Sequence, residues 1–431
     1  MPLVQLCEWG RKSCPDWPVE VRGEMNDLAR EWARRERLNA PPIEWIGDTI
    51  CARQFVGVVE CGEFQVEIFP KLDKKLLAGG ALDEERQNTA LGHLLRLLDA
   101  ALFEEHIENG QALLQDEPLA FPDIWAFLLA RHLERELRRG VPHAYITRRD
   151  DLPRVRGKIE LKRQIGTHFG RADRLACVWD EYSGGNALNR LFRCALDWLR
   201  PRVHHGGAKR GIGRCLSLLE EAQLVSPREA LSGAQHLSWT RANRRFEPHL
   251  GFAVRLLRGQ SPDFGARNAR SWVFLTDMNA LFEAFCARAL EARLKTRVWE
   301  QELVGHLFHS PKATKQLADF VWRDGETWFV GDAKWKLLGS GAPLINDEEV
   351  ENTRGSSRSL SPADVRQLTT YSELLKRREK LQSTPEMWIL YPTMSEEKAF
   401  PAPLETWNGG RLRRVPVHVC NWNTPGDALE L

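Results

Sequence analysis

The chain has 431 residues, a length typical of two or three domains. Its 61 Lys and Arg and 59 Asp and Glu leave a formal net charge of +2, which neither indicates nor excludes a nucleic-acid partner. Hydrophobic residues make up 42% and charged residues 28%, values that exclude wholesale disorder, collagen and a coiled coil. No apolar run approaches the roughly 18 residues that cross a bilayer, and the N-terminus lacks the organisation of a signal peptide, so we expect a cytoplasmic protein with no membrane partner.

The first 140 residues predict a helix, a β-hairpin and a helical core, in that order. Apolar residues recur at helical spacing within 17–40. The period then changes to two and predicts strands at Phe55–Glu60 and Phe64–Phe69, joined by a turn. From about 87 to 140 the helical period returns, and Gly140 is expected to end the second helix.

A local excess of positive charge lies in the segment 145–182, which is predicted to be extended. Between Arg148 and Arg174, nine Lys and Arg face four acids, which gives a local excess of +5. This excess has two interpretations: a solvated strand face, or a surface that contacts phosphates or a partner.

Helices resume after this segment. The pattern predicts helices at Ala187–Leu199, with Asn186 as N-cap, and within 215–224 and 241–258. The glycine-rich stretch GGAKRGIGR (206–214) does not match a phosphate-binding loop, because its lysine is followed by arginine rather than Ser or Thr. We therefore expect that this chain binds no nucleotide.

The last domain boundary is predicted near residue 265, where the pattern changes once more. A short apolar run at Trp272–Leu275 leads into a helix at Asp277–Leu290, and strands follow through 299–335. A loop rich in Gly, Ser and acids is predicted at 339–361. The next helix has three N-terminal signals, namely Ser361 as N-cap, Pro362 at the first position and Asp364 in a pattern like a capping box.

The segment Leu317–Lys336, LADFVWRDGETWFVGDAKWK, predicts a second hairpin. Asp324-Gly325 is a strong two-residue turn between two alternating apolar strands. Arg323 is then expected to pair with Glu326, and every other pair follows from that register.

This register places Asp319, Asp332 and Lys334 on one face of the hairpin, because side chains alternate by two along a strand. Asp319 and Asp332 become diagonal neighbours whose Cα atoms lie roughly 7–8 Å apart. Two carboxylates at this spacing can hold one Mg²⁺ and leave positions for a phosphate oxygen and a water. Lys334 is expected to orient or deprotonate that water, so the sequence predicts metal-assisted phosphodiester hydrolysis.

Three further residues are candidates for the same site. Glu283, in the helix before the strands, is a possible third carboxylate, although a solvent-facing helix Glu is an alternative. Gln367 and Tyr371 lie four residues apart on the helix after the loop and point to one face, where an ordinary polar helix edge is the alternative. The order of carboxylate helix, Asp hairpin, loop and Q-x-x-x-Y helix is more specific than any single element.

With these residues in place, the sequence resembles the PD-(D/E)xK nuclease superfamily and, within it, the McrC family, the nuclease subunit of McrBC-type modification-dependent restriction systems. The resemblance matches Asp319, Asp332 and Lys334 to the catalytic triplet, and Glu283, Gln367 and Tyr371 to supporting positions. Ala318 stands where the superfamily name has proline. The resemblance rests on FVGVVECGEFQVEIFPKL (55–72), RVRGKIELKRQ (154–164), CVWDEYSGGNALNRLFRCAL (177–196), DMNALFEAFC (277–286), LADFVW, GDAKWK and QLTTY.

The resemblance implies an α+β multi-domain protein: an N-terminal β-rich domain (1–84), a middle region that couples to a motor (85–265) and a C-terminal restriction-endonuclease-like α/β/α domain (266–431). It implies an Mg²⁺-dependent endonuclease that cuts double-stranded DNA carrying a modified base such as 5-methylcytosine. The implied partner is a McrB-like AAA+ GTPase hexamer, whose hydrolysis is stimulated by a stalk formed from the N-terminal and middle segments of this chain. Arg and Lys of 148–163 are candidate contacts.

Two alternatives stay open. The same fold would suit a RecB/Cas4-like nuclease associated with a helicase, which also fits the Q-x-x-x-Y helix. A purely architectural activator of an AAA+ motor, with a vestigial nuclease face, is the second alternative. The intact triplet of Asp319, Asp332 and Lys334 disfavours it.

Overall fold

The computed structural model is a mixed α/β, multi-domain structure. The chain forms two compact units, Met1–Phe121 with Phe264–Leu431, and Pro122–Asp263. Within the described ranges, no helix is both long and apolar enough to cross a membrane. The division into three domains at residues 84 and 265 stays a prediction. The structure describes residues 2–72, 82–103, 117–171, 173–259, 271–308, 314–335, 361–394, 403–406, 408–420 and 422–429.

The first unit contains a four-stranded sheet in which the predicted N-terminal hairpin is confirmed. Its order is β1-β6-β5-β10, with β1 parallel to β6 and the other pairs antiparallel. A side chain at Gly57 would meet the Phe274 carbonyl oxygen at 2.1 Å, and Gly57 has φ +137°, so glycine is what lets β10 pair there. The strands are β1 (Leu3–Cys7), β5 (Phe55–Cys61), β6 (Phe64–Phe69) and β10 (Trp272–Asp277).

A helix and a small sheet cover this four-stranded sheet and share one apolar core with it. Met25 and Leu28 of the helix, Ile43 and Ile50 of the small sheet, and Val59 are all buried in this core. The helix predicted within 17–40 is thereby confirmed. The elements are α1 (Val19–Arg35), β2 (Arg11–Ser13), β3 (Ile43–Ile46) and β4 (Thr49–Ala52), with strand order β2-β4-β3.

The helices predicted between 87 and 140 are present as α3 (Glu84–Leu102) and α4 (Phe121–Arg138). Asp83 caps α3, because its side chain accepts a hydrogen bond from the Arg86 N–H. The helix α3 packs against α10 (Met278–Leu294) in the first unit. Apart from Phe121, its first residue, α4 belongs to the second unit.

The second unit is built on helices. Asn186 caps α6 through the Asn189 N–H, as predicted. The helix predicted at 215–224 is wrong in its bounds, because the glycine-rich stretch 206–214 is itself helical and His205 caps it through the Gly207 N–H. The elements are α6 (Ala187–Leu199), α7 (Gly206–Leu218), α8 (Pro227–Gln235), η2 (Arg244–Phe246) and α9 (Glu247–Arg258).

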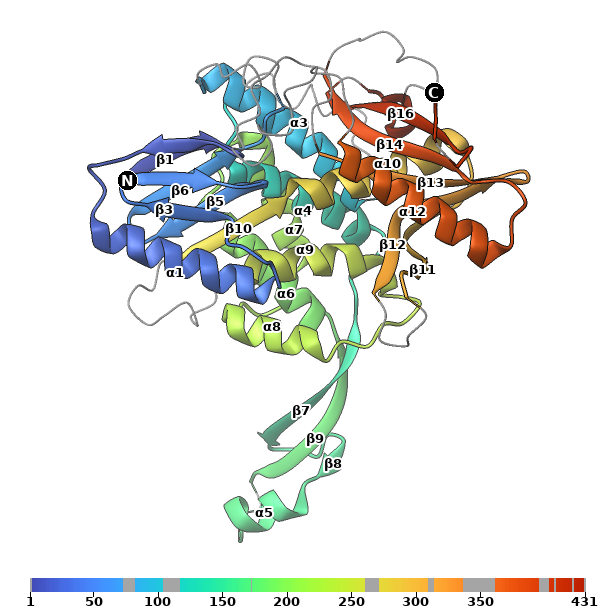
Figure 1. Cartoon of the computed structure of the whole chain (residues 1–431). Coiled ribbons are helices and arrows are strands. Elements are labelled where there is room, and N and C mark those ends of the chain that lie inside the picture. Colours follow the sequence, from blue (N-terminus) through green and yellow to red (C-terminus); the bar gives the residue numbers. More distant parts are fainter. Residues whose placement is uncertain are drawn as a thin grey trace. The chain divides into compact units, whose positions relative to one another are not determined.

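The segment predicted to be extended at 145–182 forms an arm that protrudes from the helices of the second unit (Figure 1). Its three strands are ordered β7-β9-β8. The helix at its tip, α5, was not predicted, because its eight residues follow strand-like patterning and carry few helix signals. The elements are β7 (Ala144–Leu152), β8 (Lys158–Ile159), α5 (Leu161–His168) and β9 (Leu175–Ser183).

Ion pairs within the arm neutralise part of its basic excess. Arg148 and Arg156 both pair with Glu181, at 3.2 and 3.0 Å. Arg163 pairs with Asp151 at 2.6 Å, and Arg171 pairs with Asp173 at 2.8 Å. Part of the positive charge seen in the sequence therefore holds the arm together. Side chains that form no ion pair with other described residues are those of Arg149, Arg154, Lys158, Lys162 and Arg174.

The second sheet of the first unit has the order β11-β12-β13-β14-β16-β15. The helix α12 (Pro362–Glu379) lies across β11 to β14, and Ser361 caps it as predicted, through the Ala363 N–H (Figure 1). The loop predicted at 339–361 lies outside the described residues, except for Ser361. The strands are β11 (Val298–His306), β12 (Lys315–Asp324), β13 (Thr327–Ala333), β14 (Glu386–Thr393), β15 (Leu404–Glu405) and β16 (Arg411–His418).

The register predicted for the β12–β13 hairpin is wrong by two residues. Asp324 pairs with Thr327, and Val321 pairs with Val330. The turn is therefore Gly325-Glu326, with Gly325 at φ +58° in the first turn position, where a type II′ turn places glycine. A shift of two keeps every side chain on its predicted face, so the hairpin still presents the same residues on one face.

Candidate functional site

The two aspartates of the hairpin lie on the face that α12 covers. Val321 and Val330 pair directly and share a buried cluster with Leu368 of α12. Asp319 is two residues from Val321 and Asp332 two from Val330, so both point to this face. Continuing the observed register by one step sets the aspartates directly opposite each other, closer than the predicted diagonal.

Keeping both Asp319 and Asp332 ionised costs free energy. Asp332 is 1% exposed, and burial raises its pKa to about 7, with a further contribution from the negative charge of Asp319. Burial also raises the pKa of Asp319, although its Oδ2 accepts a hydrogen bond of 2.9 Å from the Ala333 N–H. Two carboxyl groups in this position favour either a retained proton or a bound cation.

Lys334 is the cation that the structure provides. Its Nζ lies 2.7 Å from Asp332 Oδ2 and 4.0 Å from Asp364 Oδ1. Burial would lower the pKa of Lys334, but the charge of Asp332 and the neighbouring carboxylates outweigh burial and raise the pKa. Lys334 is therefore an ammonium at neutral pH, which favours orientation and charge stabilisation over the alternative predicted role as a base.

A chain of hydrogen bonds from α12 orients this ammonium. Lys334 Nζ donates to Gln367 Oε1 at 3.2 Å, and Gln367 Nε2 donates to the Tyr371 hydroxyl at 2.7 Å. The structure thus brings Gln367 and Tyr371 to the hairpin face. Asp364 was missed as a site residue because its position suggested a capping box. Its i, i+3, i+7 spacing to Gln367 and Tyr371 was a usable signal.

Glu283 of α10 also reaches this region, but through an intermediary. The side-chain amide of Gln301, on β11, donates to Glu283 Oε1 and lies 3.4 Å from Asp319 Oδ1. Burial raises the pKa of Glu283, and the charge of Asp319 raises it further. Gln301 was missed, because only the β11–β12 register places it opposite Asp319, and that register has no signal in the sequence.

Gln301 has an unusual backbone conformation, with φ +49° in the middle of a strand. A residue with a Cβ rarely adopts this conformation, and strain of this kind is found most often where a side chain must be aimed at a site. The conformation accompanies the contact of its amide with two carboxylates.

The hairpin supplies a pair of metal-binding groups rather than a full set. In the described ranges, no three His, Cys, Asp or Glu side chains converge closely enough to hold a metal ion. Asp332 Oδ1 is buried and has no hydrogen-bond partner among the described residues, so it is available to a ligand. Asp319 and Asp332 therefore fit a hard cation that completes its coordination with water.

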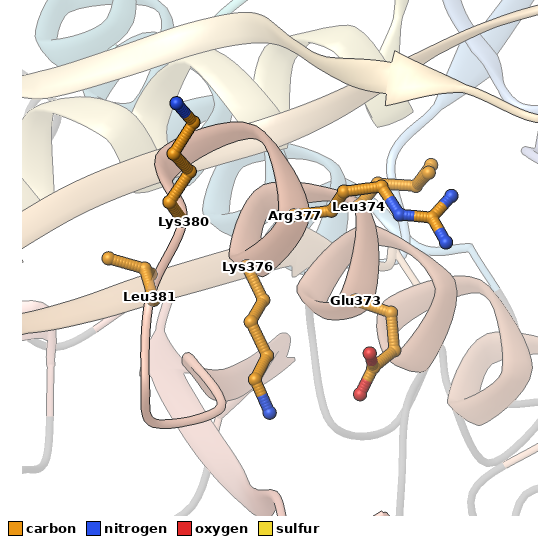
Figure 2. Close-up of a pocket in the computed structure, with 6 residues that line it drawn as sticks. All are labelled: Glu373, Leu374, Lys376, Arg377, Lys380 and Leu381. Atoms are coloured by element: carbon orange, nitrogen blue, oxygen red, sulfur yellow. The ribbon is translucent and has the colours of Figure 1, made fainter.

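A shallow depression of about 520 Å³ at the C-terminal end of α12 does not belong to this site. It is lined by basic side chains that include Lys376, Arg377 and Lys380. Figure 2 shows these cations pointing in different directions rather than toward a common point. Basic residues at this end of a helix are accounted for by the helix dipole.

The fold and the site define a multi-domain α/β protein with a buried aspartate, a half-buried aspartate and a lysine at the end of one hairpin. The model of the McrBC 5-methylcytosine restriction system component matches residues 50–392. This match covers well over half of the chain, so the protein belongs to the McrBC family, which confirms the resemblance seen in the sequence.

Two solved structures from Thermococcus gammatolerans are similar to this chain. One is described as a half-complex from a tetradecameric assembly of McrB AAA+ hexamers with bound McrC; it is 19% identical, has a TM-score of 0.62, and the match covers 96% of this chain and 94% of that chain. The other, the McrBC complex, is 21% identical with a TM-score of 0.46, covering 68% and 88%. No curated protein matches the chain. The first likeness shows a shared fold.

The strain at Gln301 can be measured with two substitutions that both remove the amide. In an ordinary strand, alanine is more stable than glycine. At φ +49°, we expect Gln301→Gly to be more stable than Gln301→Ala by about 1 kcal/mol, because glycine adopts this conformation without a Cβ clash. Urea unfolding of the two variants measures the difference, and an alanine variant as stable as the glycine variant would contradict the strained conformation.

Proposed function

We propose that this protein is the nuclease subunit of a McrBC-like restriction complex, an Mg²⁺-dependent endonuclease of the PD-(D/E)xK type that cuts modified double-stranded DNA. The observation that carries the proposal is the pair of the buried Asp332 and the half-buried Asp319 beside the Lys334 ammonium, in a member of the McrBC family. Family membership favours this role over the helicase-associated alternative.

Asp319 and Asp332 are the groups that would hold the metal. Bound there, Mg²⁺ would supply charge neutralisation at a phosphate and an activated water. The fit rests on hard oxygen donors, on the free Asp332 Oδ1 and on a carboxyl pair whose pKa values burial has raised. Glu283, which the sequence predicts as a third metal ligand, does not converge with the two aspartates in the described residues, so its proposed role is that of a hydrogen-bond partner of metal-bound water, with Gln301 fixing its position.

The remaining residues act as positioned charges and dipoles. The Lys334 ammonium is held within reach of the carboxylates and can stabilise negative charge that develops on a phosphate oxygen. Gln367 fixes the direction of Lys334, and Tyr371 fixes Gln367. A pre-oriented cation of this kind needs little reorganisation when the phosphodiester reacts.

The catalytic assignment predicts a selective loss of cleavage in Asp332→Asn. This variant keeps the shape of the side chain and removes the buried charge, so it should fold at least as stably as wild type and lose cleavage by roughly 100-fold or more. The assay is cleavage of methylated plasmid with Mg²⁺, GTP and the AAA+ partner.

Asp324→Asn is the matched control, because Asp324 lies at the exposed turn of the same hairpin. It should cut as wild type does. Equal cleavage by Asp332→Asn and wild type would refute the assignment. No cleavage by the wild type itself would leave the architectural activator as the better account.

We further propose that the arm of the second unit docks on an AAA+ GTPase hexamer and stimulates its hydrolysis. The Thermococcus gammatolerans assembly holds McrC on McrB AAA+ hexamers. In this chain, α5 and its C-cap residue carry three apolar side chains, at i, i+4 and i+8, that are exposed to solvent: Leu161 is 68%, Ile165 61% and the C-cap Phe169 84% exposed. An exposed stripe at helical spacing is suited to a protein partner.

Removing this stripe is expected to weaken the partner interaction. The triple variant Leu161→Gln, Ile165→Gln and Phe169→Gln should lower affinity for the AAA+ partner by at least about tenfold, with a matching loss of GTPase stimulation. Ile46→Gln, which removes an exposed apolar side chain of β3, is the control and should have no effect. Binding measured by calorimetry that is unchanged in the triple variant would exclude α5 as the docking element.

A further inference from the structure

A buried carboxylate joins the N-terminal sheet to the segment that carries Asp332 and Lys334. Glu8 directly follows β1, is 1% exposed, and donates its backbone N–H to the Phe69 carbonyl oxygen at 2.9 Å. Its Oε1 accepts from the Lys71 N–H and its Oε2 accepts from the Trp335 indole N–H, both at 3.0 Å. The second bond spans most of the chain.

Trp335 is held from two sides. Its indole N–H is bound by Glu8, and its ring packs on Phe282 of α10 at a centroid distance of 5.3 Å. One residue before it, the Lys334 N–H donates to the Leu390 carbonyl oxygen of β14 at 2.9 Å. One residue after Phe282 comes Glu283. Lys334 and Glu283, which are adjacent in sequence to Trp335 and Phe282, therefore both belong to the candidate site.

A buried carboxylate at position 8 costs free energy. Burial raises the pKa of Glu8 to about 7, even though two N–H donors and the charge of Lys71 oppose the rise. An apolar side chain would avoid this cost, but it would not fix the direction of the Trp335 indole. The geometry is that of a group that orients a neighbour.

We propose that Glu8 is a positioning residue for the nuclease site: by binding the Trp335 indole N–H it fixes the end of β13 and so the placement of Lys334 and Asp332. This inference rests on the proposed function. It assigns the N-terminal sheet a part in the chemistry of the C-terminal sheet. Small misplacements of catalytic groups have large effects on rate, so the contact is expected to appear in turnover rather than in DNA binding.

The test is a double-mutant cycle with Glu8→Gln and Trp335→Phe in the full chain with its partner. Glutamine at position 8 keeps one hydrogen-bond acceptor but places an NH₂ donor against the second of the two N–H groups that Glu8 binds. Phenylalanine at position 335 keeps an aromatic ring against Phe282 and removes the indole N–H donor. Each single variant should lower the cleavage rate at saturating DNA by roughly tenfold and leave the half-saturating DNA concentration unchanged. The double variant should be no slower than the slower single variant, because both changes break one contact.

Affinity for Mn²⁺ in the absence of DNA gives a second readout, since misplacement of Asp332 should weaken it several-fold in the same variants. The control is Glu67→Gln. Glu67 is a buried carboxylate of the same sheet, bonded to Gln5 and Gln65 and not to Trp335. It should leave both the cleavage rate and the Mn²⁺ affinity unchanged.

Three results would overturn the proposal. Glu8→Gln and Trp335→Phe variants that fold, cut and bind Mn²⁺ as wild type does would show that the contact only supports the fold. Effects that multiply in the double variant would show that the two residues act independently. If the wild type neither cuts DNA nor binds Mn²⁺, and so behaves as Asp332→Asn does, both the proposed function and this inference are overturned. If the wild type is active and the Glu8 variants are equally active, only this inference is overturned.

Discussion

The burial of Asp332 next to Asp319 is the constraint on which the rest of the site depends. A carboxylate that is 1% exposed beside a second carboxylate cannot be ionised cheaply, and its pKa rises to about 7. The surrounding residues offset this cost in free energy. Lys334 is 2.7 Å away, Gln367 and Tyr371 hold Lys334 in place, and the Ala333 N–H binds Asp319. Such a cluster is poorly suited to stabilising a fold, because an apolar pair would do so at lower cost. It is suited to a cation and a phosphate.

The fold explains how residues far apart in sequence supply one site. The β12–β13 hairpin presents the two aspartates, α12 covers them and brings Gln367 from beyond a long intervening segment, and α10 brings Glu283. The same first unit contains the N-terminal sheet, whose last strand, β10, comes directly before α10. The N-terminal residues are thus part of the framework that holds the candidate site, through β10 and through Glu8. The second unit, with its arm, carries the exposed apolar side chains that we propose dock on the AAA+ partner.

The sequence predicted the elements of this site well, because each had a local signal. The alternation of β12 and β13, the cap at Ser361 and the i, i+4 spacing of Gln367 and Tyr371 are all confirmed as structure. The predicted hairpin register is wrong by two residues, since glycine occupies the first turn position instead of the second, but the even shift leaves every side chain on its predicted face.

Gln301 and Glu8 could not be predicted, because their partners are set by strand pairing and by a contact between distant segments. The α5 helix was missed because it is short and because Leu161, Ile165 and Phe169 are exposed among the described residues, so they do not form the buried apolar face that marks most helices.

The most direct measurement of the central claim is the affinity of the isolated protein for Mn²⁺, a spectroscopic substitute for Mg²⁺, at pH 6 and pH 8. A raised folded-state pKa means that the Asp319–Asp332 pair keeps a proton at pH 6 and has lost it at pH 8, and the metal binds the deprotonated pair. We expect wild type to bind Mn²⁺ more tightly at pH 8 than at pH 6, by roughly tenfold for one proton displaced, and Asp332→Asn to lose most of this affinity and its pH dependence. Equal affinity at both pH values, together with unchanged binding in Asp332→Asn, would contradict this expectation.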